Sequence, residues 1–303
     1  MGFFNSLNFE KLRLLFLDPS KIFTRLCWEM GYVVKKHKEN LIPVVGEDPR
    51  VLPYLKKLPF NLMELPLSRG VGLRFYPLSI NTFHPFILAL INKETGLDSK
   101  VHAFQILKKY SELVNVRNAN DFLGFSREEG IFQQDSHPYE FTFPWSTKSP
   151  GEMKKNYIGY YSIENRKYGL NSDECLESVY VSTEKIQLEA TRLINLLYSI
   201  TNNGYVGKEI DPIGGAVFVK GEEWKWFVEG GQHRAAVVTA MGMEKVLVHV
   251  KRFVRREDVN IWPGVKTGIY SPHSALKLFD HMFEHKAPSS AKAWVDYVNK
   301  DLR

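Results

Sequence analysis

Apolar residues recur at three- and four-residue intervals in several segments of the chain, and this spacing places them on one face of a helix. The pattern predicts helices over residues 21–36, 84–91, 99–114 and 186–200. Ser182 or Thr183 is suited to cap the last of these helices, and Gly204 is suited to end it. Ser271 and Ser289 are the expected caps of two short helices that close the chain.

Short apolar runs predict strands, most of them in the second half of the chain. Strands are expected over residues 72–79, 179–181, 216–220, 226–228 and 242–251. Because strands and helices alternate in the second half, the pattern predicts an α/β (mixed α+β) fold. Residues 146–178 are polar and are interpreted as the connection into that half.

An aromatic segment, Tyr139-Glu-Phe-Thr-Phe-Pro-Trp145, stands out in the irregular region before this connection. Such a segment is either local core beneath a loop or a surface on which a sugar ring stacks, since aromatic faces suit the apolar side of a pyranose.

Charge and composition narrow the function classes. The chain has 303 residues, of which 44% are hydrophobic, so it can bury a large core. Its 40 basic and 34 acidic residues give a net charge of +6, but the two signs are interspersed. The modest basic excess favours anionic substrates or a solvated surface. Because no long basic block occurs, the charge pattern argues against a nucleic-acid partner.

Cys27 and Cys175 are too few for a disulfide framework, so a reducing, cytoplasmic compartment is expected. Charges interrupt the apolar residues of the first 27 positions, so neither a signal peptide nor a transmembrane segment is expected there. That stretch is either a helix packed on the core or an amphipathic helix in peripheral contact with a membrane.

The candidate chemistry centres on the turn after the strand at residues 226–228. Gly230 and Gly231 lead into a helix that opens with Gln232, His233 and Arg234. A helix N-terminus presents unpaired N–H groups and a partial positive charge, and glycines let an anion approach the backbone closely. The turn therefore predicts a phosphate site, although a glycine turn followed by a solvated His-Arg pair is the structural alternative.

The order of motifs around this turn resembles the ParB/sulfiredoxin-like superfamily. A helix containing Tyr198-Ser-Ile precedes the dipeptide Pro212-Ile213, and a Gly-x-x-Arg turn ending at Arg234 follows. The resemblance covers residues 179–255 and implies a nucleotide-binding domain there. Residues 1–178 then form a mixed α+β region that contributes to an acceptor pocket, and residues 256–303 form closing helices.

The chain also departs from that superfamily. Gln232 stands where sulfiredoxins have a cysteine, so their thiol chemistry is excluded. Gly230 stands where the serine kinases of the superfamily have an aspartate, although the His-Arg pair is kept. About fifty residues follow the domain, and they do not resemble the helix-turn-helix DNA reader of ParB proteins.

The resemblance implies a phosphotransferase that uses ATP or ADP with Mg²⁺. Glu189 is the expected general base, since a glutamate near the phosphate turn has that role in the small-molecule kinases. His233 is expected to assist it, by donating to a phosphate or by orienting Arg234. The structural alternative for Glu189 is a helical ion pair with Arg192. Asp211 and Glu229 are further carboxylates near the turn, and Glu229 is a candidate Mg²⁺ ligand.

The expected function is therefore a nucleotide-dependent kinase acting on a hydroxyl of a small molecule, sugar or glycan intermediate. In the N-terminal half, the segments Pro77-Leu-Ser79, His84-Pro-Phe86 and Phe143-Pro-Trp145 resemble ParB-like proteins associated with surface-polysaccharide synthesis. The competing hypothesis is a non-catalytic, CTP-gated binding protein of the partition type. A third is a scaffold whose turn binds sulfate or nothing.

Overall fold

The computed structural model describes residues 48–54, 62–91, 98–114, 116–125, 130–171, 174, 181–205, 212–285 and 287–302. Contacts divide the chain into residues 1–42 and 43–303, and all of the described residues belong to the second unit. The helix expected over residues 21–36, both cysteines and Asp211 lie outside the described residues.

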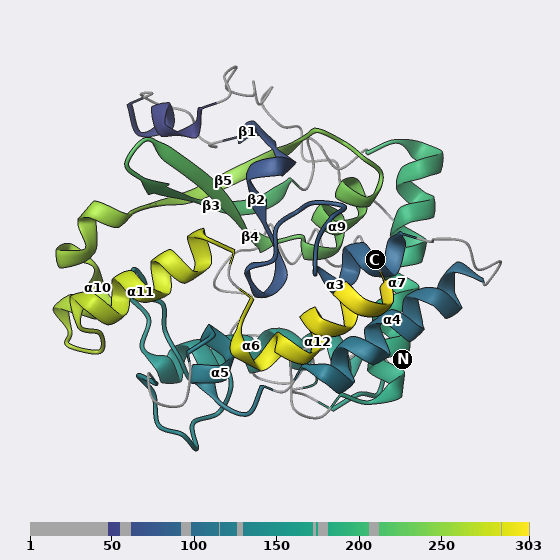
Figure 1. Cartoon of the computed structure of the whole chain (residues 1–303), viewed down its shortest axis with the longest axis horizontal. Coiled ribbons are helices and arrows are strands. Elements are labelled where there is room, and N and C mark those ends of the chain that lie inside the picture. The colour runs from purple at the N-terminus through teal and green to yellow at the C-terminus, as the bar shows by residue number, and fades with distance from the viewer. Residues whose placement is uncertain are drawn as a thin grey trace, which may run out of the picture. The chain divides into compact units, whose positions relative to one another are not determined.

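One five-stranded mixed sheet runs through the described part of the second unit, with strand order β1-β5-β3-β4-β2 (Figure 1). The strands are β1 (Leu62–Pro66), β2 (Gly70–Val71), β3 (Ile213–Lys220), β4 (Glu223–Gly230) and β5 (Lys245–Arg255). β3 pairs antiparallel with β4 and parallel with β5, and β2 pairs parallel with β4. The predicted mixed α/β class is therefore confirmed. β1 and β2 come from the expected N-terminal region, so that region shares its sheet with the expected nucleotide-binding domain.

The central strand is β3, and its sequence explains that position. Its first seven residues are all buried, which is the pattern of a strand covered on both faces. On the neighbouring strand β4, Trp226 is fully buried, and its indole Nε1 donates to the carbonyl oxygen of Pro66 at 2.9 Å. This bond ties β4 to the end of β1.

Helices flank the sheet (Figure 1). They are α3 (Pro85–Leu90), α4 (Ser99–Leu113), α5 (Ala119–Leu123), α6 (Pro150–Arg166), α7 (Thr183–Asn203), α9 (Gln232–Ala240), α10 (Pro263–Lys266), α11 (Pro272–Phe283) and α12 (Lys292–Tyr297). α3 and α7 contact each other, and both contact α4 and α9, so this group brings α7 and α3 against the helix that follows the glycine turn.

The predicted caps give a mixed outcome. Ser182 caps α7 by accepting from the N–H of Lys185, and Ser271 caps α11 in the same way, as predicted. The prediction for Ser289 is wrong: this residue begins a 3-10 turn (Ser289–Ala291), and the N-cap of α12 is Ala291.

Two predicted segments differ from the structure. The polar connection contains the 17-residue helix α6, whose half-buried Met153, Tyr157, Ile158 and Tyr161 follow helical spacing. Residues 72–79 are not a strand. They contain a 3-10 turn (Leu73–Phe75) in which Arg74 adopts a left-handed conformation, φ 53°, held by bonds from its guanidinium to Phe122 O and Ser290 Oγ.

The aromatic segment at residues 139–145 belongs to the core. Tyr139 and Phe141 are buried. The half-buried Trp145 packs edge-to-face on Phe218 of β3 and on Trp262. These rings join the sheet to the α11 side of the molecule, since Phe279 of α11 also contacts Trp145.

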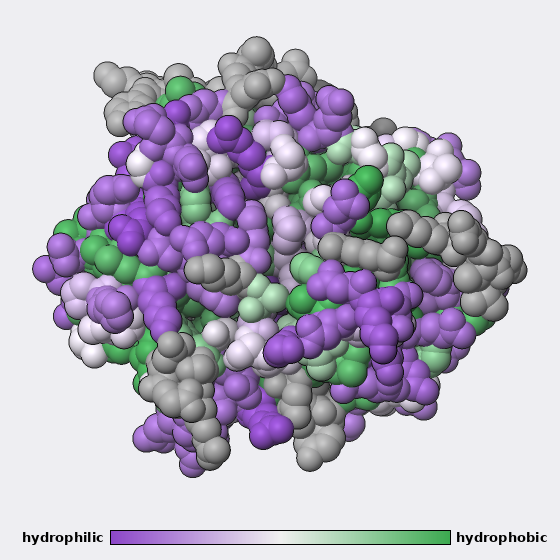
Figure 2. Space-filling model, in the orientation of Figure 1, coloured by the Kyte–Doolittle hydropathy of each residue, from purple (hydrophilic) through white to green (hydrophobic). Residues whose placement is uncertain are grey.

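Hydrophilic residues predominate on the face shown in Figure 2, and hydrophobic residues appear there in separate areas. Among the described helices, none has the length and apolar character needed to cross a membrane.

Candidate functional site

The glycine turn has the backbone geometry that its sequence predicts. β4 ends at Gly230, and Gly231 follows in a left-handed conformation with φ 86° as the N-cap of α9. The first N–H groups of a helix lack an intrahelical acceptor, and no side chain caps them at this end of α9. A Cβ atom at Gly231 would lie 3.0 Å from Nη2 of Arg234, so the guanidinium folds back over the glycine.

Two β-bulges flank β3 at the level of this turn. Gly214 pairs with Gly230 and Gly215 with Val228, so Glu229 is the extra residue of β4. On the other side, Gly215 pairs with Val250 and Ala216 with Arg252, so the next extra residue is Lys251 of β5. Bulges redirect side chains, and here they redirect one carboxylate and one ammonium group.

The bulge at Lys251 brings its ammonium group to the turn. A Cβ atom at Gly214 would lie 2.7 Å from Nζ of Lys251, and one at Gly230 would lie 3.8 Å from it. Burial and the charge of Lys251 together lower the pKa of His249 on the same strand. Within the described residues Lys251 forms no ion pair, and its ammonium group lies at Gly230 while the guanidinium of Arg234 lies at the next residue, Gly231.

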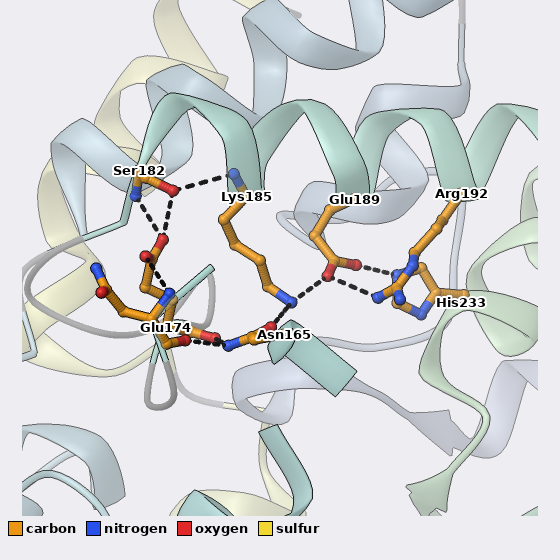
Figure 3. A network of polar contacts seen from close by, with 8 residues as sticks. Asn165, Glu174, Ser182, Lys185, Glu189, Arg192 and His233 are labelled. Carbon is orange, nitrogen blue, oxygen red and sulfur yellow. Dashed lines mark hydrogen bonds and ion pairs between the residues drawn. The ribbon is translucent and has the colours of Figure 1, made fainter. Parts of the chain in front are cut away.

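Glu189 lies buried on α7 and faces three positively charged or titratable groups (Figure 3). Its Oε1 is 2.8 Å from Nζ of Lys185 and 3.1 Å from Nη1 of Arg192, and its Oε2 is 2.6 Å from Nε2 of His233. Burial raises the pKa of this carboxyl, but the contacts with His233 and Lys185 outweigh burial and hold the pKa at about 2.

His233 in the first turn of α9 is fixed from two directions. Glu189 holds its Nε2, and the ring of Phe86 stacks on the imidazole with centroids 4.7 Å apart. Its side chain is 32% exposed, so the imidazole keeps access to solvent and to a ligand at the turn. The sequence prediction that joined Glu189 and His233 in one site therefore corresponds to a direct contact.

A buried polar network continues from Glu189 away from the turn (Figure 3). Nζ of Lys185 donates to Oδ1 of Asn165 at 2.9 Å, and both side chains are buried. Asn165 in turn donates to the carbonyl oxygens of Asn171 and Glu174. The carboxylate of Glu174 accepts from the backbone and hydroxyl of Ser182, which caps α7.

The remaining predicted residues lie in different surroundings. The side-chain amide of Gln232 donates through Nε2 to the carbonyl oxygen of Val228 at 2.9 Å, so that nitrogen is engaged with the backbone. Glu229 pairs with Arg252 at 3.0 Å. Arg192 contacts Glu189, as the structural alternative for that glutamate expects, and its guanidinium lies 5.1 Å from the ring centroid of Tyr168.

No cluster of three or more metal-binding side chains occurs among the described residues. Glu229 is paired with Arg252, and the oxygens of Glu189 are taken by Lys185, Arg192 and His233. These carboxylates do not fit a protein-held Mg²⁺ ion. The turn does fit a phosphate, since the glycines let the side chains of Arg234 and Lys251 lie close against a backbone that has free N–H groups at the start of α9.

A separate cavity of about 240 Å³ lies near the other end of β4. It is lined by Asp48, Arg50, Pro66, Arg69, Glu222 and Trp224. Arg50 is paired with both carboxylates of this cavity, and the guanidinium of Arg69 lies 4.5 Å from the ring centroid of Trp224. Its two positive and two negative charges balance, so it offers less attraction for an anion than the glycine turn does.

Comparisons of the chain with protein-family models, with curated proteins and with solved structures found no match. The resemblance to the ParB/sulfiredoxin-like superfamily therefore stays a sequence-based expectation, and the chemistry of the site is argued from its own geometry.

Sequence reasoning missed three residues of the site: Lys185, Phe86 and Lys251. Lys185 stands four residues before Glu189, the spacing of a helical ion pair, so a signal was present. The pair Gly214-Gly215 signals a bulge or a close approach inside a strand, and that signal points to Lys251 once the strands are paired. Phe86 carries no comparable signal because its contact with His233 joins distant segments.

Proposed function

We propose that the glycine turn binds the phosphates of ATP or ADP, and that the protein transfers a phosphoryl group to a hydroxyl of a small molecule, sugar or glycan intermediate. Support comes from the charges around the turn. The N-terminus of α9, the guanidinium of Arg234 and the ammonium of Lys251 converge on a backbone that carries no side chains at Gly230 and Gly231. Phosphoryl transfer depends mainly on such positioning and charge stabilisation.

The observation that carries the proposal is the 2.6 Å contact between Glu189 and His233 in the first turn of α9. It supplies a proton acceptor beside the phosphates. With a pKa of about 2 and both oxygens engaged, Glu189 is a weak base at neutral pH. We therefore assign the general base to His233 and give Glu189 the role of orienting it.

In the proposed reaction His233 accepts the proton of the acceptor hydroxyl. The hydroxyl oxygen forms a bond to the terminal phosphorus of the nucleotide, and the bond from that phosphorus to the leaving phosphate oxygen breaks. Arg234 and Lys251 balance the charge of the phosphates during this exchange. Glu189 and Glu229 are engaged with basic side chains, so Mg²⁺ would be held by the nucleotide phosphates and would supply further charge stabilisation there. We place the reaction in the cytoplasm, in line with the small number of cysteines.

A thermal-shift panel of ATP, ADP, CTP and GTP, each with and without Mg²⁺, tests the binding step. An adenine nucleotide at a hundred times its Kd is expected to add about 2.7 kcal/mol to the stability of the folded protein. Arg234→Ala is expected to abolish most of this gain. Arg255→Ala, at the far end of β5, is the matched control and retains it. A preference for CTP without turnover would favour the nucleotide-gated binding protein instead, and no shift with any nucleotide would contradict the proposal.

The catalytic step is tested by His233→Gln and Glu189→Gln. Both variants are expected to bind nucleotide and to lose transfer by about a hundredfold or more, the range that a general base contributes. Acceptors are screened as pools of hydroxylated metabolites and sugars with labelled ATP. A folded His233→Gln variant with unchanged turnover would show that His233 is not the base.

A further inference from the structure

The two oxygens of Glu189 have separate partners. Oε1 lies 2.8 Å from Nζ of Lys185 in an ion pair and accepts from Nη1 of Arg192 at 3.1 Å, while Oε2 lies 2.6 Å from Nε2 of His233 (Figure 3). Lysine and arginine side chains only donate hydrogen bonds, so the oxygen that they share must be an acceptor. The carboxylate is thereby prevented from turning, and the other oxygen is left for the imidazole.

Lys185 is itself held in place. It is 1% exposed, and its ammonium group also donates to Oδ1 of Asn165 at 2.9 Å. Asn165 is fixed by its two bonds to the carbonyl oxygens of Asn171 and Glu174, each 2.8 Å long. The position of the ammonium group is therefore determined by α6 and by the segment that follows it, independently of His233.

We propose that Lys185 and Arg192 fix the tautomer of His233 by keeping Glu189 ionised and holding it with one oxygen against Nε2 of the imidazole. An ionised carboxylate can only accept a hydrogen bond, so the short contact at Oε2 requires a proton on Nε2 of His233. In the neutral imidazole the lone pair then lies on Nδ1. Nδ1 has no hydrogen-bond partner among the described residues.

The other groups around His233 are compatible with this arrangement. From α3, Phe86 covers one face of the imidazole, and the buried His84 stands behind it. From α7 come Lys185, Glu189 and Arg192, and from α9 itself comes Arg234. Glu189 is the one carboxylate among these described neighbours, so the tautomer depends on its ionised form and its place beside Nε2.

The consequence for catalysis rests on the proposed function. Nδ1 is then the atom that takes the proton from the acceptor hydroxyl, and the imidazolium that forms keeps its Nε2–H bond to Glu189. The tautomer itself is a property of the protein without nucleotide, so it can be tested whether or not transfer occurs.

The test is nitrogen NMR of the full-length protein labelled with ¹⁵N-histidine, recorded without nucleotide at a pH where the histidines are neutral. For His233 the expected result is a protonated Nε2 and an unprotonated Nδ1. The resonances are assigned by their loss in His233→Gln. A protonated Nδ1 in the unaltered protein would overturn the proposal without any further variant.

Glu189→Gln tests whether Lys185 and Arg192 decide which end of the side chain faces His233, because an amide, unlike a carboxylate, has one accepting end and one donating end. Lys185 and Arg192 are expected to hold the amide oxygen of the glutamine, which turns its NH₂ group toward His233. Nε2 must then accept a hydrogen bond, and the tautomer inverts so that Nδ1 carries the proton. Retention of the original tautomer in a folded Glu189→Gln protein would overturn the role of the two cations.

The double variant Lys185→Met/Glu189→Gln completes the design, with Lys266→Met/Glu189→Gln as its control. Without Lys185 the amide is free to present its oxygen to His233, so a measurable fraction of the original tautomer returns. The control changes an exposed lysine of α10 and stays inverted. Equal inversion in both double variants would assign the orientation to Arg192 alone and contradict the role of Lys185.

Discussion

Phe86 lies stacked on His233, with ring centroids 4.7 Å apart and ring planes 21° from parallel. The contact joins α3 to α9, and the next ring along the row is His84, 5.8 Å from Phe86. Burial, with a smaller contribution from the charge of His233, lowers the pKa of His84 to about 3. His84 is therefore neutral at physiological pH, and the imidazole at the turn is separated by Phe86 from a neutral histidine behind it.

Phe86→Leu removes the stacked ring while keeping an apolar side chain. We expect the free energy of unfolding to fall by about 1–2 kcal/mol, since a stacked aromatic pair contributes beyond its buried area. Urea denaturation measures the change. Phe104→Leu is the control, because Phe104 of α4 is half-buried and has no ring contact with the described residues. A loss in Phe104→Leu as large as that in Phe86→Leu would contradict the prediction.

The carboxyl of Glu189 predicts an acid-dependent loss of stability. Its pKa of about 2 lies below the ordinary value of 4.5. A group whose pKa is depressed on folding contributes stability that is complete above the unfolded pKa and is lost as the pH falls through the folded one. Stability should therefore fall between about pH 4.5 and pH 2, and the depression corresponds to roughly 3 kcal/mol at about 1.4 kcal/mol per unit.

Urea denaturation at pH 6, 4 and 3 measures this loss against Lys185→Met/Glu189→Gln. The double variant removes the carboxyl and its buried partner together, so that no buried charge is left without a partner. Its stability should fall less over the same pH range. Parallel losses in the two proteins would place the acid sensitivity elsewhere in the molecule.

The sequence predicted the features that depend on residues adjacent along the chain, namely helix ends and the glycine turn. Ser182, Gly204 and the turn at Gly230 and Gly231 are local signals, and the structure has α7 and the turn where they indicate. The contact between Glu189 and His233 was within reach because the resemblance placed both at one site. The helix α6 was not predicted because the segment is mostly polar, and its apolar residues form only one narrow face.

Long-range contacts account for the rest. The Lys185 partner of Glu189 is itself held by Asn165, and this hydrogen bond forms only when α6 and α7 come together. The direction of the Lys251 side chain depends on a bulge that exists only once β5 pairs with β3. Neither arrangement follows from the spacing of residues along the chain.

Gly231 and Gly242 flank α9 and form a matched pair. Both are left-handed, with φ 86° and 75°, but a Cβ would contact Arg234 at Gly231 and meets nothing within 4 Å at Gly242. Alanine at either position should cost about 1–2 kcal/mol of stability through backbone strain. Only Gly231→Ala should also weaken nucleotide binding, because it displaces the guanidinium. Calorimetric titration with ATP measures this, and equal affinities in the two variants would contradict the role of the turn.

The ammonium group of Lys251 can be removed by one substitution and displaced by another, so its role at the turn can be tested in two ways. Lys251→Met should weaken ATP binding by about tenfold, or roughly 1.4 kcal/mol, by removing one charge from the phosphates. Gly214→Ala keeps the charge but places a Cβ 2.7 Å from the present position of Nζ, so the flexible side chain must move.

Both variants should therefore bind ATP more weakly than Lys266→Met, which alters a remote lysine of α10. The affinity of Gly214→Ala should fall between those of Lys251→Met and the unaltered protein, because its ammonium group remains nearby. Isothermal titration at low salt resolves these differences, since screening weakens exposed charges. If Lys251→Met and Gly214→Ala bind as Lys266→Met does, the bulge in β5 serves the sheet alone, and the phosphates depend on Arg234 and the N-terminus of α9.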